Sequence, residues 1–152
     1  LEENMKTLIE NKKARLEYEF VDTYEAGMEL MGHEVKAIRA GMANLLGSRV
    51  VVRAGEAYLV GATVSPYQQG NTPKSYDPER TRRLLLSKKE LRKLEGAESQ
   101  GGLTLVTIMV YNQKRFIKLS FGLGRKKKKH DKRATLRDRD ARRDIDRSLK
   151  SQ

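Results

Sequence analysis

The spacing of hydrophobic residues changes along the chain, and it predicts where strands and helices lie. Residues 16–20 read Leu, Glu, Tyr, Glu, Phe, an alternation typical of a strand with one face in solvent. In residues 25–35, Met28, Met31 and Val35 recur at i, i+3 and i+7, which predicts a short helix on the core despite two internal glycines. A strand followed by a helix is therefore expected near the start of the chain.

Two β-hairpins are predicted by β-branched and aromatic runs that meet at short polar turns. The first pair of runs joins through Ala54-Gly55-Glu56, where glycine permits a tight turn. The second pair joins through Asn112-Gln113. The four runs are residues 49–53, 57–63, 103–111 and 114–121. With the strand at residues 16–20, they give at least five strands.

A polar stretch and a second helix separate the two hairpins. Residues 65–78 contain turn-forming pairs and predict a mobile exposed loop: Pro66-Tyr67, Gly70-Asn71 and Asp77-Pro78. Residues 87–90 read Ser-Lys-Lys-Glu, the spacing of a capping box. Leu91 and Leu94 then lie one helical turn apart, and Gly101-Gly102 ends the run.

Composition limits the class of protein. The chain has 152 residues, 38% hydrophobic and 34% charged, which suits one small domain, and no window approaches the roughly 20 apolar residues that a membrane helix needs. It has no Cys and two His, which excludes a disulfide framework and the usual Cys/His zinc site. We expect a cytoplasmic monomer without cofactor, metal or membrane partner. The fold class predicted is mainly β, an oligonucleotide-binding-type β-barrel with two or three short helices, although the strand count leaves a sandwich open.

Positive charge is concentrated at the C-terminal end. The chain has 32 Lys and Arg against 20 Asp and Glu, a net charge of +12, which indicates a polyanionic partner. Residues 125–152 contribute +8 of this and contain no aromatic residue, Gly or Pro, so we expect a basic tail that is disordered when free. We expect residues 5–124 to form the RNA-binding barrel and residues 1–4 to be an artificial remnant ahead of the natural start.

Two interpretations of the tail remain open. It could be a solubilising appendage, as many charged tails are. The alternative is a segment that becomes helical on nucleic acid, which is favoured because Ala141, Ile145 and Leu149 recur at i, i+4 and i+8.

Six strings along the chain together suggest a family. They read NKKAR (11–15), YEAG (24–27), GHEVKAIRAG (32–41), ANL (43–45), DPERTRRLLL (77–86) and HDKR (130–133). In this order they resemble the SsrA-binding protein family. The resemblance implies an oligonucleotide-binding-type barrel with appended helices and no enzymatic activity. It also implies an adaptor that binds the tRNA-like domain of transfer-messenger RNA and delivers it to stalled ribosomes for trans-translation.

Candidate RNA-binding residues come from side-chain chemistry and from the resemblance. Arginine and lysine can contact phosphates and stack on bases, and the candidates are Arg39, Arg80, Arg82, Arg83 and Lys118. Asn11 and Asn44 offer donors and acceptors to a looped-out base or a 2′-hydroxyl. The resemblance implies that Asn11, Glu25, Leu85 and Lys118 grip the tRNA-like domain, and Glu34 and Lys36 complete the set.

Alternatives stay open for three of these residues. Leu84-Leu85-Leu86 is a pattern more typical of a buried strand than of a binding site. Glu25 and Glu34 suit a structural role better than an RNA contact, either by pairing with a neighbouring arginine or by capping, because an acid that faces RNA must accept a hydrogen bond from a base.

The resemblance also assigns a ribosomal role to the tail. It implies that His130 stacks on a base of small-subunit ribosomal RNA near the decoding centre and that Asp131, Lys132 and Arg133 anchor the tail. The full candidate set in the tail is Lys129, His130, Asp131, Lys132, Arg133, Ile145 and Leu149. His130 is a poor catalytic candidate, since no nucleophile or second histidine accompanies it.

Two other functions compete with the adaptor. The same charge and fold suit a nonspecific single-strand nucleic-acid binder or RNA chaperone. Tyr67 and Tyr76 in the loop are then the free stacking platforms, and the scarcity of such aromatics argues against this alternative. A small hydrolase would need a catalytic constellation, and none is recognisable.

Overall fold

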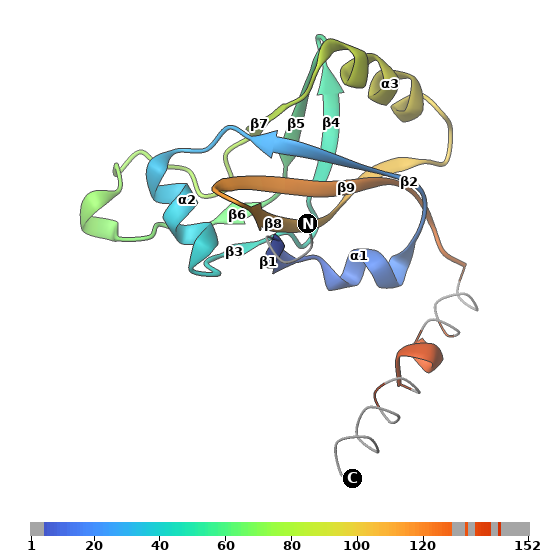
Figure 1. Cartoon of the computed structure of the whole chain (residues 1–152), viewed down its shortest axis with the longest axis horizontal. Coiled ribbons are helices and arrows are strands. Elements are labelled where there is room, and N and C mark those ends of the chain that lie inside the picture. The colour runs from blue at the N-terminus through green and yellow to red at the C-terminus, as the bar shows by residue number, and fades with distance from the viewer. Residues whose placement is uncertain (1–4, 129–132, 134–135, 141–142, 144–152) are drawn as a thin grey trace.

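The computed structural model describes residues 5–128, 133, 136–140 and 143 (Figure 1). In chain order its elements are β1 (Met5–Glu10), α1 (Lys12–Glu17), β2 (Tyr18–Met28), α2 (Gly32–Arg39), β3 (Ala43–Asn44), β4 (Arg49–Arg53), β5 (Glu56–Val60), β6 (Thr63–Val64), the 3₁₀ turn η2 (Gln69–Asn71), β7 (Arg82–Leu85), α3 (Lys88–Glu98), β8 (Thr104–Gln113) and β9 (Phe116–Lys126). Among the described residues, no helix combines the length and apolar character needed to cross a membrane.

Seven strands form one sheet, of which six close into a ring and β1 pairs with β8 beside it. Their order is β1-β8-β4-β5-β7-β2-β9, and β9 pairs again with β8 to close the ring. The ladder between β8 and β9 extends over most of both strands. Between β4 and β8, by contrast, the ring is closed by the single residue pair Arg49 and Val106. This mainly β, OB-like architecture confirms the predicted fold class, because the main sheet is one continuous ring rather than two sheets packed face to face.

The core lies inside the ring and under the helices. Leu59, Leu84, Leu119 and Phe121 come from β5, β7 and β9 and are fully buried, as expected for the inward face of alternating strands. Figure 1 shows α3 over the end of β4 and β5, and α2 together with the segment before β7 on another side of the ring. The helices therefore leave much of β2, β7 and β9 uncovered.

The first predicted strand and helix are shifted. Leu16 belongs to α1, which Asn11 begins as N-cap by accepting a hydrogen bond from the Ala14 N–H. The strand β2 then continues to Met28, which pairs with Leu84 of β7. The helix predicted for residues 25–35 starts only at Gly32, because the first part of that segment is held in the β2–β7 and β2–β9 ladders.

The predicted hairpins are present with one change of turn. β4 and β5 pair as expected around Ala54-Gly55. The β8–β9 turn falls at Lys114-Arg115, two residues beyond Asn112-Gln113, and Lys114 takes the positive φ of 56° that the tight turn requires. The helix α3 has the predicted capping box, in which Ser87 and Glu90 bond reciprocally.

The structure contains elements that the sequence pattern did not predict. The strand β1 pairs with β8, and the six-residue helix α1 follows it. The strand β9 extends to Lys126, where Arg125 pairs with Glu19. Two residues assigned to the basic tail therefore belong to the ring.

Candidate RNA-binding site

Three residues form a row across the uncovered part of the ring. Gly27 of β2 pairs with Leu85 of β7 on one side and with Lys118 of β9 on the other. Directly paired residues of antiparallel strands project to the same face, and glycine contributes no side chain between its neighbours. A Cβ on Gly27 would lie 3.5 Å from the Leu85 Cβ. Leu85 is 49% exposed, so it lies on the outer face rather than in the core.

Two hollows flank Lys118 on this face. One, of about 560 Å³, lies towards α3 and is bordered by Glu25, Lys93 and Lys118 among other residues. The other, of about 210 Å³, lies towards α2 and includes Arg39 and Leu85 in its lining. We call this region the Leu85–Lys118 surface and define it by Glu25, Gly27, Arg39, Leu85, Lys93, Arg115, Phe116 and Lys118.

Phe116 and Arg115 belong to this surface although the sequence analysis did not select them. Phe116 is 64% exposed at the β8–β9 turn, and the Arg115 carbonyl accepts a hydrogen bond from Arg39 Nη2 at 3.2 Å. The sequence contained a signal for Phe116. Ile117, Leu119 and Phe121 alternate along the strand and point inward, so the even-numbered residues of the strand point outward. The surface combines cationic side chains with exposed apolar ones, which suits a phosphate backbone with unstacked bases.

The acidic residue of the surface, Glu25, lies beside a buried phenol. Tyr111 of β8 is 1% exposed, and its hydroxyl has no hydrogen-bond partner in the described part of the chain. Burial, and next the Glu25 carboxylate, raise the pKa of Tyr111 to about 12. Glu25 itself is exposed, so its carboxylate can accept a hydrogen bond from an RNA base.

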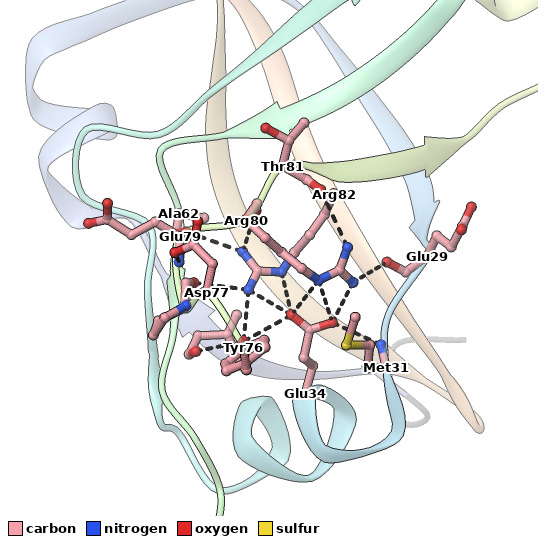
Figure 2. A network of polar contacts seen from close by, with 12 residues as sticks. Glu29, Met31, Glu34, Ala62, Tyr76, Asp77, Glu79, Arg80, Thr81 and Arg82 are labelled. Atoms are coloured by element: carbon pink, nitrogen blue, oxygen red, sulfur yellow. Dashed lines mark hydrogen bonds and ion pairs between the residues drawn. The ribbon is translucent and has the colours of Figure 1, made fainter. Parts of the chain in front are cut away.

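A polar network lies between α2 and the segment before β7, and it involves three of the candidate residues. Figure 2 shows the Glu34 carboxylate between the guanidinium groups of Arg80 and Arg82. Arg82 Nε donates to Glu34 Oε2 at 2.8 Å, and Arg80 Nε donates to both carboxylate oxygens at 3.1–3.2 Å. The Tyr76 hydroxyl lies 3.0 Å from Glu34 Oε2 and 2.8 Å from the Val64 carbonyl oxygen. This network joins α2 to the loop before β7.

Arg82 uses all three guanidinium nitrogens within the protein. Besides Glu34, it donates to the carbonyls of Ala62, Pro78 and Arg80 at 2.9–3.2 Å. Both Arg82 and Glu34 are fully buried, and Arg80 is turned towards the same carboxylate. We therefore leave these three side chains out of the Leu85–Lys118 surface.

The electrostatics of Glu34 show how burial is compensated. Burial by itself raises the pKa of this carboxyl group, but hydrogen bonds from Arg80, from the Met31 N–H and from Arg82 outweigh it and lower the pKa to about 2. The bond from Met31 also caps the first turn of α2 at 2.8 Å. Glu34 is thus both ion-paired and capping, the two structural roles considered for it from sequence.

The remaining candidates in the ring lie in different places. Asn11 is 6% exposed, and its Nδ2 donates to the Leu45 and Thr107 carbonyls, so it connects α1 to β8. Asn44 is exposed but accepts a bond from the Leu46 N–H at 2.8 Å. Arg83 is exposed and bridges Glu29 and Glu56. Lys36 is exposed on α2, away from the Leu85–Lys118 surface.

Of the two loop tyrosines, only Tyr67 is free to stack. It is 39% exposed, whereas Tyr76 is held by Glu34 and its ring meets His33 edge-on with centroids 4.5 Å apart. The prediction that Tyr76 is a free stacking platform is therefore wrong. Within the described residues there is no group of three or more His, Cys, Asp or Glu side chains that could hold a metal ion.

Most of the tail candidates lie outside the described residues: Lys129, His130, Asp131, Lys132, Ile145 and Leu149. Arg133 is described and is exposed in a helical segment. The structure therefore leaves the tail roles as predictions.

Comparison with known proteins identifies the family. The family model for SmpB protein matches residues 8–151, nearly the whole chain. The chain belongs to the SmpB protein family. It is 46% identical over 149 residues to the SsrA-binding protein of Microcystis aeruginosa, covering 98% of this chain and 97% of that protein. It is 48% identical over 146 residues to the SsrA-binding protein of Synechococcus elongatus, covering 96% of this chain and 95% of that protein.

A solved structure has the same fold. It is described as "tmRNA-SmpB: a journey to the center of the bacterial ribosome" and matches with a TM-score of 0.66 at 40% sequence identity. The match covers 87% of this chain and 96% of that one. The OB-like ring described above is therefore the SmpB fold.

Proposed function

We propose that the protein is an RNA-binding adaptor that binds the tRNA-like domain of transfer-messenger RNA and delivers it to stalled ribosomes for trans-translation. Membership of the SmpB family along nearly the whole chain carries this proposal. The description of the solved relative names tmRNA-SmpB and the center of the bacterial ribosome. Because ribosomes are the proposed destination, we place its action in the cytoplasm, and we propose a binding role without a catalytic step.

The Leu85–Lys118 surface is the proposed contact with the tRNA-like domain. It unites Glu25, Leu85 and Lys118 from β2, β7 and β9, which the family resemblance also selects. Arg39 and Arg115 add positive charge for phosphates, and exposed Phe116 adds a flat ring for an unstacked base. Asn11 supports the proposal only indirectly, because its amide holds α1 on β8.

Binding of a labelled tRNA-like domain tests this proposal. Lys118→Ala and Leu85→Ser should each weaken binding about tenfold, the effect of losing one charge-assisted or well-packed contact. Lys74→Ala and Leu46→Ser are matched controls, because both residues are exposed outside the surface. If unlabelled single strands and ordinary tRNA compete as well as the tRNA-like domain itself, the protein is a nonspecific binder and the adaptor proposal fails.

A rescue assay tests delivery separately. Lys118→Ala should reduce tagging of the nascent peptide on stalled ribosomes in proportion to its lost RNA binding. His130→Ala should leave RNA binding intact and reduce tagging, if the tail acts after delivery. Equal loss of RNA binding in both variants would contradict this division between ring and tail.

A further inference from the structure

A second groove lies on the other side of α2 from the Leu85–Lys118 surface. It has a volume of about 390 Å³ and is lined by His33, Lys36, Tyr67, Gln68, Asn71 and Thr72 among others. On α2, Val35 and Arg39 border the first surface, whereas His33 and Lys36 border this groove. Residues three or four apart share a helix face, so the helix presents different faces to the two sites. We call this second site the Tyr67 groove.

The lining of the Tyr67 groove is cationic and contains no acid. Lys36 is exposed and forms no ion pair within the described residues. By contrast, the larger hollow of the Leu85–Lys118 surface includes Glu25 and Glu90. An unneutralised ammonium beside a groove without carboxylates favours an anionic ligand such as a phosphate.

An exposed aromatic ring and two amides lie beside this charge. Tyr67 is 39% exposed and offers a face on which a base can stack. Asn71 Nδ2 donates to Gln68 Oε1 at 2.6 Å. The Asn71 oxygen and the Gln68 nitrogen have no partner in the described part of the chain, so an amide oxygen and an amide NH2 group remain for a base edge.

The polar network of Glu34 and Tyr76 lies next to the Tyr67 groove and connects its loop to α2. The His33 ring packs edge-on against Tyr76 at 85°, and both His33 nitrogens are buried without a hydrogen-bond partner among the described residues. Tyr76 is fixed in turn by Glu34 of α2 and by the Val64 carbonyl. These contacts fix Tyr76, near the end of the loop that carries Tyr67, Gln68 and Asn71, to α2 and so limit the movement of the loop relative to the helix when a ligand binds.

We propose that the Tyr67 groove binds one unpaired RNA nucleotide, with its base stacked on Tyr67, its edge facing Gln68 and Asn71, and its phosphate near Lys36. This contact is separate from the tRNA-like domain proposed for the Leu85–Lys118 surface. The two sites share no residue, so an RNA can engage both or either one.

Photocrosslinking and titration of a short oligouridine that contains 5-iodouridine test the proposal on the full chain. The crosslink should map to Tyr67. Tyr67→Leu should weaken binding of the oligouridine about fivefold or more, whereas Tyr67→Phe, which keeps the ring, should bind like the unchanged chain. Lys36→Gln should reduce the slope of log affinity against log salt by about 0.7, and Lys74→Gln, an exposed lysine of the same loop outside the groove, should not.

Three results would overturn the proposal. One is oligouridine binding by Tyr67→Leu within twofold of the unchanged chain, with the crosslink elsewhere. A second is loss of oligouridine binding in Lys118→Ala alone, which would place all RNA contact on the first surface and leave the adaptor proposal standing. The third is unchanged RNA binding by Tyr67→Leu together with lost peptide tagging, which would assign the groove to a protein partner.

Discussion

Glu34 and Arg82 form an ion pair with an N–O distance of 2.7 Å in which both side chains are fully buried. Glu34 lies on α2 and Arg82 begins β7, so the pair fastens the helix to the ring. Burying two charges costs several kcal/mol per ion unless their hydrogen bonds are complete. They are complete here because Arg80, Tyr76 and three carbonyls supply the remaining partners (Figure 2).

Removal of the Glu34 charge should strongly destabilise the protein. Glu34→Gln leaves Arg82 buried without its counter-ion, and we expect the free energy of unfolding to fall by about 3–5 kcal/mol. Urea denaturation measures this change. Glu56→Gln, which removes a partner of exposed Arg83, is the matched control and should cost under about 1 kcal/mol. Equal small losses in both variants would show that the buried pair contributes no more than a surface pair.

The free energy of unfolding should also depend on pH through the Glu34 carboxyl group. Its pKa is lowered to about 2 in the folded protein from an ordinary value of 4.5. A carboxyl group with a lowered folded-state pKa stabilises the fold above its unfolded pKa and loses that contribution as the pH falls. We expect roughly 3 kcal/mol to be lost between about pH 5 and pH 2. Denaturation at several pH values should give a flatter acid limb for Glu34→Gln, and an unchanged slope would contradict the assignment.

The sequence predicted correctly those elements whose structure is determined by residues close together in the chain. Turn chemistry at Ala54-Gly55 and the capping box at Ser87 were sufficient for the first hairpin and α3. The helix predicted for residues 25–35 was displaced because Gly27 and Met28 pair with β7 and β9, contacts between segments far apart in sequence. The ring closure by Arg49 and Val106 has no local signal for the same reason.

The candidate site was predicted in part. Lys118 and Leu85 were selected, and the structure brings them to either side of Gly27. Arg80 and Arg82 look like RNA contacts in sequence because arginine is usually exposed. Their pairing with Glu34 across 46–48 residues turns them inward. A structural role was expected for Glu34, but no local pattern reveals which distant arginines it pairs with.

The position at which the tail is removed should determine stability. A chain ending at Gly124 loses the ladder pairs of Arg125 and Lys126 and the bond from the Lys127 N–H to the Glu17 carbonyl, 2.7 Å long. A chain ending at Lys128 keeps them all. We expect the shorter chain to lose about 1–3 kcal/mol relative to the longer one, measured by thermal melting. Loss of a cooperative melt in the chain ending at Lys128 would show that residues beyond it are needed for the ring to fold.

The Tyr111 hydroxyl should contribute nothing to stability at neutral pH. It is buried without a hydrogen-bond partner in the described part of the chain, and an unsatisfied buried hydroxyl costs about 1 kcal/mol or more. Tyr111→Phe should therefore leave the free energy of unfolding unchanged or raise it by about 1 kcal/mol. A loss of that size in urea denaturation would mean that the hydroxyl has a partner, with Glu25→Gln as the variant that tests whether Glu25 is that partner.

Alkaline pH should separate the unchanged chain from Tyr111→Phe. The pKa of Tyr111 is raised from 10.0 to about 12, first by burial and then by Glu25. Because the folded-state pKa is raised, the phenol of the unfolded chain ionises first between pH 10 and pH 12, so the unchanged chain loses stability over that interval. Tyr111→Phe has no such phenol, so its stability relative to the unchanged chain should rise over that interval. Parallel denaturation curves at pH 7 and pH 11 measure this difference in the free energy of unfolding. If the difference between the two proteins is the same at both pH values, Tyr111 titrates normally. The Glu25 carboxylate beside it is then directed away from the phenol.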